Sequence, residues 1–347
     1  MPAKKHHYVP VFYQKGFADA EGLLWVYDRK LKNYKHLHPN VMCRAEDLYA
    51  VRPDNAPKDR RIETDILSPI ESDAAPIIRK LVPGIALSEE ETAKLAFFIA
   101  LQRTRLPSFG RAVSKMQEVN MEQLMRIQFA NVDRATTALN ELAAWTSEKV
   151  DIEPESMVKA VLNDEIKITA TERPFLEAMF EQAKTLTKWM GRAHWSFLVA
   201  PASHPFILCD HPFTIVPPEG VRLDGVGPGL PGVVNYFPIN RRLCLKLRHG
   251  VFAMRFWDID SLYVHLVNRN VAANSERFIM CANKQLLEDI VASSGCSEFT
   301  ALERFSVDVL KSDENESFVK FSFRPGRYFY NKQLTGECRA NVIDSPL

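Results

Sequence analysis

Five polar residues that lie far apart in the sequence have the types needed for metal-assisted hydrolysis of phosphoesters: His7, Glu71, Arg105, Asp210 and Asn268. The imidazole and the two carboxylates, from His7, Glu71 and Asp210, suit Mg²⁺ or Mn²⁺ better than zinc as metal ligands. A metal ion held there would activate water, and the Arg105 guanidinium would neutralise the phosphate. We therefore predict these five residues as catalytic, provided that the fold brings them together.

The N-terminal run His6-His7-Tyr8-Val9-Pro10 is unusually rich in aromatic and imidazole groups for a chain terminus. Neighbouring side chains of an extended segment point to opposite faces, so His6 and Tyr8 share one face and His7 takes the other. The two histidines therefore cannot easily bind one metal ion together, and we choose His7 as the ligand. We predict His6, Tyr8 and Gln102 as binding residues.

Each of these groups also has a structural interpretation. Asp210 would cap a turn before Pro212, Glu71 would be a solvated helix charge, and Arg105 would stabilise the C-terminal end of a helix. A histidine near the terminus would hydrogen-bond a backbone carbonyl. Together these roles define an alternative function: a non-catalytic binding or effector protein in which the same residues form a buried polar network.

The first two thirds of the chain contain the elements that must position these groups. Val9-Pro10 should be extended and lead into a short helix over 10–18, followed by a β-hairpin formed by 23–28 and 34–38. Ser88 and Glu91 form a capping box that begins a helix running to Pro107. Apolar periodicity predicts further helices over 66–81 and 111–150, and Pro154 and Pro174 begin two more.

Short apolar runs replace this pattern after Gly191. We predict strands at 195–199, 206–209, 243–247 and 318–323 and helices at 259–278 and 285–292. The fold class is therefore α+β, with an N-terminal β-hairpin region, a helical middle and a mixed α/β C-terminal half. The expected regions are 1–62, 63–191 and 192–347, integrated into one structural unit.

Composition and charge bear on the partners and the cellular compartment of the protein. The formal net charge of the 347-residue chain is +1, so nothing in it indicates nucleic acid or an acidic membrane as partner, although a local basic patch stays open. The six cysteines form no CxxC pair and are expected to be reduced thiols. We find no secretory signal and no apolar run of the roughly 20 residues that cross a bilayer. A cytoplasmic protein is expected.

The opening motif and several later segments together resemble a known family. His6-His7-Tyr8-Val9-Pro10, Tyr13, Phe17 and Trp25-Val26-Tyr27-Asp28 resemble the opening of the bacterial family called domain of unknown function 4238. The likeness continues over nearly the whole chain, at Glu63, Ile70-Glu71, Gln102-x-x-Arg105-x-Pro107, Asp210-x-Pro212, Phe237-Pro238-Ile239 and Asn268. Cys209 departs from the pattern, because such proteins more often have Ser or Thr before the aspartate. The resemblance implies a single structural unit and brings no established activity.

Overall fold

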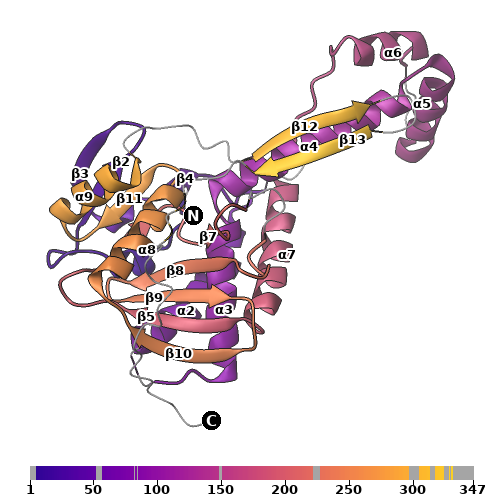
Figure 1. Ribbon diagram of the computed structural model, residues 1–347. Coiled ribbons are helices and arrows are strands. Elements are labelled where there is room, and N and C mark those ends of the chain that lie inside the picture. The colour runs from indigo at the N-terminus through magenta and orange to yellow at the C-terminus, as the bar shows by residue number, and fades with distance from the viewer. Residues whose placement is uncertain are drawn as a thin grey trace.

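The computed structural model describes residues 5–51, 57–81, 83, 85–147, 151–221, 227–296, 305–312, 317–323, 328 and 330. Its two main sheets, the helices that pack on them and a projecting arm are shown in Figure 1. The predicted fold class, α+β with an N-terminal hairpin, a helical middle and a mixed C-terminal half, is confirmed. None of the helices in the described part of the chain is long and apolar enough to cross a membrane.

The N-terminal hairpin is completed by strands from the other end of the chain. Strands β2 (Leu24–Asp28) and β3 (Asn33–Leu37) pair as predicted. The C-terminal half adds β11 (Phe278–Cys281) and β6 (Leu208–Cys209), so the sheet has the order β3-β2-β11-β6 and is antiparallel throughout. The hairpin is therefore part of a sheet that cannot form without residues more than 170 positions later.

A second sheet belongs wholly to the C-terminal half. Its five strands have the order β10 (Ala253–Asp258), β5 (His194–Val199), β9 (Leu243–Arg248), β8 (Val234–Asn240) and β7 (Thr214–Val216). Strands β10 and β5 are parallel, and the other pairs are antiparallel. Side chains such as Trp195, Phe197 and Leu245 are fully buried in the main core.

Three helices pack together in Figure 1 beside this sheet: α2 (Ser68–Lys80), α3 (Glu89–Thr104) and α7 (Arg173–Met190). The predicted capping box of α3 is confirmed, because Ser88 Oγ accepts the N–H of Glu91 and the Glu91 carboxylate accepts the N–H of Ser88. The π-helical segment η2 (Ile62–Leu67) leads directly into α2. The short helix α1 (Val11–Lys15) follows strand β1 (Lys5–His7), which pairs with β4 (Arg44–Glu46) after the 3-10 turn η1 (Pro39–Val41).

An arm projects from the body. It consists of α4 (Pro107–Gln128), α5 (Val132–Thr146) and α6 (Pro154–Leu162), with the hairpin of β12 (Phe305–Ser312) and β13 (Ser317–Phe323) lying along α4 (Figure 1). The arm has a small core of its own, whose buried members are Phe129, Ala135, Leu139 and Val161. The outer part of the arm, formed by α5, α6 and the end of α4, therefore depends little on the main core, whereas the start of α4 packs against α7.

Two predicted helices are wrong in extent. The helix expected over 111–150 is divided, because Asn131 caps a new helix: its side chain accepts the N–H of Arg134. The helix expected over 259–278 is α8 (Ser261–Asn274), which ends before β11. The helix α9 (Lys284–Ser294) was expected over 285–292. Strands β4, β7, β8, β10, β11 and β12 were not predicted, while the strand expected at 318–323 is β13.

Candidate functional site

Arg105 is the centre of a polar cluster that joins three separate segments. Its side chain is 1% exposed. The guanidinium donates to Glu71 Oε1 (2.7 Å), to the backbone oxygen of His7 (2.6 Å) and to the hydroxyl of Tyr49 (3.1 Å). The Tyr49 hydroxyl donates in turn to the backbone oxygen of Arg105 (2.8 Å). Burial alone would lower the pKa of Arg105, but Tyr49 and Glu71 outweigh it and raise that pKa.

The two histidines take opposite faces of β1, as the strand geometry predicts, but His6 is the one in the buried network. Its ring is fully buried and stacks on Tyr49, with centroids 5.5 Å apart, and its Nδ1 accepts the Tyr49 N–H (3.1 Å). This contact fixes the tautomer that carries its proton on Nε2. The half-buried His7 ring instead bonds the backbone oxygen of Asn40 through Nε2 (3.0 Å). Thus His7 reaches Arg105 only through its backbone.

Glu63 is a second carboxyl group at the Arg105 cluster. It lies on the π-helical segment, where the N–H and the hydroxyl of Ser68 both reach the Glu63 backbone oxygen. A π-turn advances fewer degrees per residue than an α-helix, so it reduces the roughly 80° offset that eight α-helical residues would place between Glu63 and Glu71. Burial raises the pKa of Glu63 to about 7, with Arg105 opposing the rise and Glu71 adding to it.

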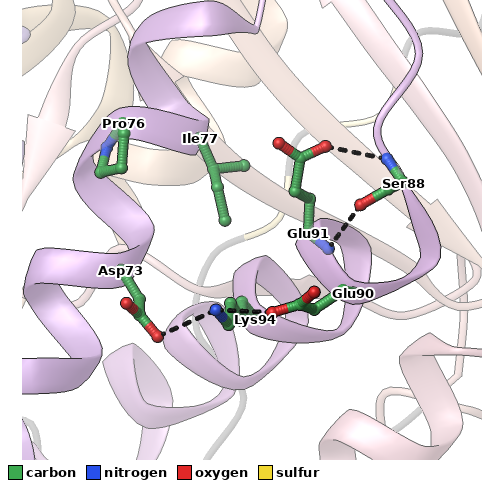
Figure 2. Close-up of a pocket in the computed structure, with 7 residues that line it drawn as sticks. All are labelled: Asp73, Pro76, Ile77, Ser88, Glu90, Glu91 and Lys94. Carbon is green, nitrogen blue, oxygen red and sulfur yellow. Dashed lines mark hydrogen bonds and ion pairs between the residues drawn. The ribbon is translucent and has the colours of Figure 1, made fainter.

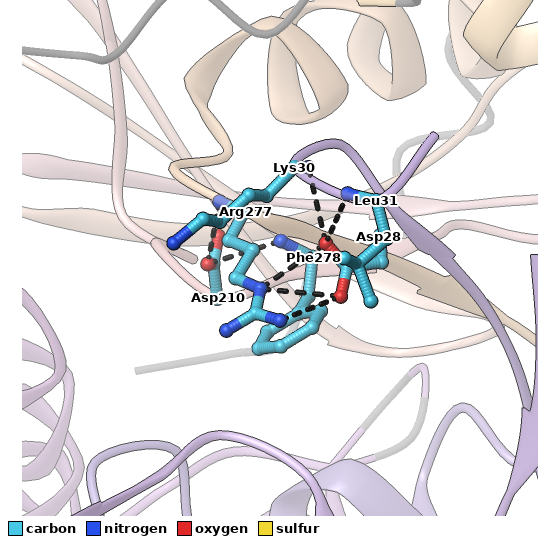
Figure 3. A network of polar contacts seen from close by, with 6 residues as sticks. All are labelled: Asp28, Lys30, Leu31, Asp210, Arg277 and Phe278. Carbon is cyan, nitrogen blue, oxygen red and sulfur yellow. Dashed lines mark hydrogen bonds and ion pairs between the residues drawn. The ribbon is translucent and has the colours of Figure 1, made fainter. Parts of the chain in front are cut away.

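Asp210 lies after β6 and holds the chain that enters β11 (Figure 3). Its carboxylate accepts the backbone N–H groups of Glu276 (2.9 Å), Arg277 (2.8 Å) and Phe278 (3.0 Å). Burial and the nearby Glu276 raise the pKa of Asp210 to about 7, while the three N–H donors act to lower it. Next to it, Arg277 forms a two-pronged ion pair with Asp28 at 2.8–3.2 Å.

Asn268 on α8 binds the chain just before β6. Its side-chain oxygen accepts the Ile207 N–H (3.1 Å), and its nitrogen donates to the Pro205 oxygen (2.9 Å). One side-chain amide thereby satisfies two backbone groups of an irregular segment. These groups would lower stability if they were buried without hydrogen-bond partners. Asn268 therefore fixes the backbone at 205–207 through its side chain.

The other two predicted binding residues, Tyr8 and Gln102, are buried side chains. Tyr8 is buried, and burial raises its phenol pKa, with Cys43 and Asp210 adding to the rise. The last turn of α3 is followed by Arg105, which binds His7, and the Arg103 guanidinium lies 5.7 Å from the ring centroid of Phe213.

Gln102, on the same turn of α3, is fully buried. Neither of its amide atoms has a hydrogen-bond partner among the described residues.

The structure does not bring the three predicted metal ligands together in one group. Throughout the described residues, no group of three or more His, Cys, Asp or Glu side chains could hold a metal ion. The predicted ligands His7, Glu71 and Asp210 are directed at three different protein partners: the Asn40 oxygen, the Arg105 guanidinium and the backbone of 276–278. Within the described residues, these three side chains therefore do not form one group that could hold Mg²⁺ or Mn²⁺.

A surface pocket of about 470 Å³ lies between α2 and α3, at the end of α3 opposite Arg105 (Figure 2). Its acidic residues are already paired: Lys94 binds Asp73 (3.3 Å) and Glu90 (2.8 Å), and Glu91 belongs to the capping box. Lys94 balances only one of the two carboxylate charges, and exposed pairs of this kind contribute little stability. None of the predicted site residues lines this pocket.

Sequence reasoning missed the role of Tyr49. This side chain is fully buried and contacts His6 and Arg105 at once, yet it stands in a short irregular segment with no periodic pattern. Glu63 was noted in the resemblance but was not predicted as a site residue. The feature that could have identified it is its position eight residues before Glu71. The π-turn between them reduces the angular offset of the two side chains.

The profile of the family described as "Protein of unknown function (DUF4238)" matches residues 5–285. The chain belongs to this family. The matched range of this DUF4238 protein holds β1 and all the polar contacts of Arg105, Asp210 and Asn268 described above. No curated protein and no solved structure shows significant similarity to the chain.

Proposed function

We propose that this DUF4238 protein is a non-catalytic binding protein in which the His, Glu, Asp and Asn residues form a structural polar network. The use of Asp210 carries the proposal: both of its oxygens accept backbone N–H groups of a distant segment. Asn268 likewise binds backbone groups at both ends of its amide. Groups used in this way hold the chain and are not directed at a substrate.

Exposed apolar side chains on the arm also support a binding role. Among the described residues, seven of the large apolar side chains that are well exposed lie on or beside the helices α4–α6: Met121, Leu124, Val132, Leu142, Trp145, Ile152 and Leu162. Apolar side chains gathered on one exposed part of a protein mark an interaction surface. The body, fixed by the polar network, would present this surface to a protein partner.

The substitution Asp210→Asn tests the proposal. An amide nitrogen cannot accept the N–H bonds that one of the carboxylate oxygens accepts, so we expect the free energy of unfolding in urea to fall by about 1–3 kcal/mol. Asp258→Asn, at an exposed position on β10, is the matched control and should leave it unchanged. We also expect no phosphodiester hydrolysis with Mg²⁺ or Mn²⁺ by the wild-type protein. Hydrolysis that Asp210→Asn abolishes without loss of stability would contradict the proposal.

A hydrolase is the second candidate, and Glu63 is the observation that favours it. Its carboxyl group is partly buried beside a cation, its Oε2 accepts no hydrogen bond within the described residues, and its pKa of about 7 suits a general base. Hydrolysis of a phosphoester or of nucleic acid would then be lost in Glu63→Gln with the fold retained. If Glu63→Gln and the wild-type protein behave alike in a screen of ester substrates, this candidate is rejected.

We further propose that the regions 1–62, 63–191 and 192–347 act as one unit in the cytoplasm of a bacterium. Residues from all three regions contribute to one main core, including Tyr13, Leu101 and Phe197. The five cysteines within the described residues are buried thiols without disulfides, which is typical of a reducing compartment. Cys338, the sixth, lies outside the described residues.

A further inference from the structure

The five-stranded sheet has an apolar face and a basic face. Trp195 and Phe197 of β5 are buried in the main core, so the residues that alternate with them point to the other side of the sheet. On that side, Ser196 of β5 lies opposite Lys246 of β9 and, on its other flank, opposite Arg255 of β10. Strand β10 forms one edge of the sheet, and Arg255 is exposed there (Figure 1). This row therefore has a cation on each flank of β5.

Two more basic side chains belong to the same side of the sheet. Arg248 lies two residues after Lys246 on β9, and its partner on β5 is His194. Strand geometry places the Cα atom of Lys246 about 7 Å from that of Arg248 and about 10 Å from that of Arg255. Burial lowers the pKa of His194, and the charges of Arg248, Arg255 and Lys246 lower it further. These four residues therefore form one patch, the basic face.

Within the described residues, the cations of the basic face are not paired with carboxylates. Lys246 Nζ donates to the hydroxyl of Tyr263 (2.7 Å), and the guanidinium groups of Arg248 and Arg255 form no ion pair with a described residue. The five strands contain one acidic residue, Asp258, which strand alternation directs to the opposite side from Arg255. Helix α8, which supplies Tyr263, contains no acidic residue. The positive charge of this face is therefore complementary to an anionic ligand.

Aromatic side chains lie beside these cations. Trp257 is two residues after Arg255 on the same side of β10, and its indole N–H has no hydrogen-bond partner among the described residues. Lys246 Nζ lies 5.3 Å from the ring centroid of Tyr263. Both rings are half-buried. Arginine and lysine bind phosphates, and the bases of a single strand stack on aromatic rings, so a sheet face with both suits single-stranded nucleic acid.

An anionic membrane fits this face less well. Membrane surfaces attract clusters of about four to eight lysines and arginines, whereas the basic face has three, which are held on neighbouring strands. Side chains that enter a membrane project from the surface, while the two aromatic rings of this face are half-buried. The residues between the cations are therefore better suited to bases than to lipid.

We propose that the basic face binds single-stranded nucleic acid, with phosphates at Lys246, Arg248 and Arg255 and a base stacked on Trp257. Cations whose Cα atoms are about 7–10 Å apart are spaced for more than one phosphate, so the ligand is a strand of several nucleotides. The positive charge is local, because the whole chain has a formal net charge of +1. This inference goes beyond the proposed function, since it assigns a second binding surface, on the body of the protein.

The salt dependence of binding tests the three cations. Fluorescence anisotropy of labelled oligonucleotides of about 12 uridines or deoxythymidines, titrated with the full chain, measures the association constant. Each phosphate of a single strand that a cation neutralises adds about −0.7 to the slope of log K against log salt concentration. We therefore expect a slope of about −2 for the wild type and about −0.7 for the double variant Arg248→Gln, Arg255→Gln. The double variant should also bind at least about tenfold more weakly at about 50 mM salt.

Exposed arginines outside this sheet provide the matched control. The double variant Arg44→Gln, Arg79→Gln removes the same charge from β4 and α2 and should keep the affinity and the salt slope of the wild type. Trp257→Leu tests the aromatic contact. It should weaken binding at least about fivefold with the slope unchanged, because stacking of a base neutralises no phosphate.

Three results would overturn the proposal. The first is no binding of either oligonucleotide up to about 100 μM protein at about 50 mM salt. The second is an equal loss of affinity in the control and in Arg248→Gln, Arg255→Gln. The third is flotation with phosphatidylserine vesicles that this variant abolishes, without oligonucleotide binding, which assigns the face to lipid. The Asp210→Asn experiment decides the proposed function separately from all three.

Discussion

At the scale of single residues, several buried polar groups in this protein bind the backbone of distant segments. Arg105 binds His7, 98 positions away, and Asp210 binds backbone groups 66 to 68 positions away. A buried charge or amide without partners lowers stability, so such groups are retained where each donor and acceptor is matched. Glu63 differs from them, because its carboxyl group is placed beside Arg105 with an oxygen left unmatched among the described residues.

Glu63 should make stability depend on pH. Its pKa is raised from 4.5 to about 7 in the folded protein, so between these values the folded state binds more protons than the unfolded state. The contribution of Glu63 to stability is therefore present below about pH 4.5 and is lost as the pH rises through 7.

Replacing Glu63 with glutamine removes this dependence. We expect Glu63→Gln to be more stable than the wild type at pH 8 by about 1–2 kcal/mol, less than the full electrostatic value because the carboxyl group is partly exposed. At pH 5 the difference should be small. Urea unfolding at both values measures it, with Asp65→Asn, exposed on the same π-turn, as control. Equal pH dependence in wild type and Glu63→Gln would contradict the argument.

At the scale of elements, contacts with near neighbours hold the starts of the helices, although the start at Asn131 was not predicted. Ser88, Asn131 and Asp260 each accept a backbone N–H in the first turn of the helix that follows. The end of α8 is different, because Asn274 donates to the His211 and Phe213 oxygens and the chain then enters β11. Contacts with a segment some 60 residues away decide that end.

The cap of α3 is a measurable case. Ser88→Ala removes the hydroxyl that accepts the Glu91 N–H, so we expect a loss of about 1 kcal/mol in the free energy of unfolding. Ser72→Ala, at an exposed position inside α2, removes a hydroxyl without removing a cap and should leave stability unchanged or slightly increased. Similar losses for the two variants would show that the capping box contributes nothing specific.

At the scale of the whole molecule, the protein combines a large shared core with an arm that has its own small core. The main core takes residues from the N-terminal motif, the helical middle and both sheets. The arm core has four buried members. Local opening requires least free energy where few apolar contacts must be lost, so the arm should open more readily than the body.

Hydrogen exchange should separate these two parts. Leu139→Ala removes a central side chain of the arm core, and we expect faster amide exchange in α5 and α6 with little change in the two main sheets. A loss of roughly 2 kcal/mol in local opening free energy is expected, at the low end for a buried leucine because the cluster is small. Leu245→Ala, in the fully buried centre of the main core, should instead raise exchange across the body. Uniform acceleration by Leu139→Ala would mean that arm and body unfold together.

The sequence by itself determined the features that depend on near neighbours. The hairpin of β2 and β3, the capped start of α3 and the opposite faces of His6 and His7 follow from turn residues, caps and strand alternation, which act over a few positions. It also singled out Arg105, Asp210 and Asn268, three buried side chains that bind backbone groups of distant segments in the structure.

Only the tertiary structure decided which partner each polar group takes. Whether Glu71 meets a metal ion or Arg105, and whether Asp210 faces a substrate or the backbone before β11, depends on how distant segments pack. It likewise decided that Trp145 is exposed on an arm, since a helical apolar stripe looks the same whether or not another element covers it. The physical reason is that near neighbours set local geometry, while burial and long-range pairing are fixed only when the whole chain folds.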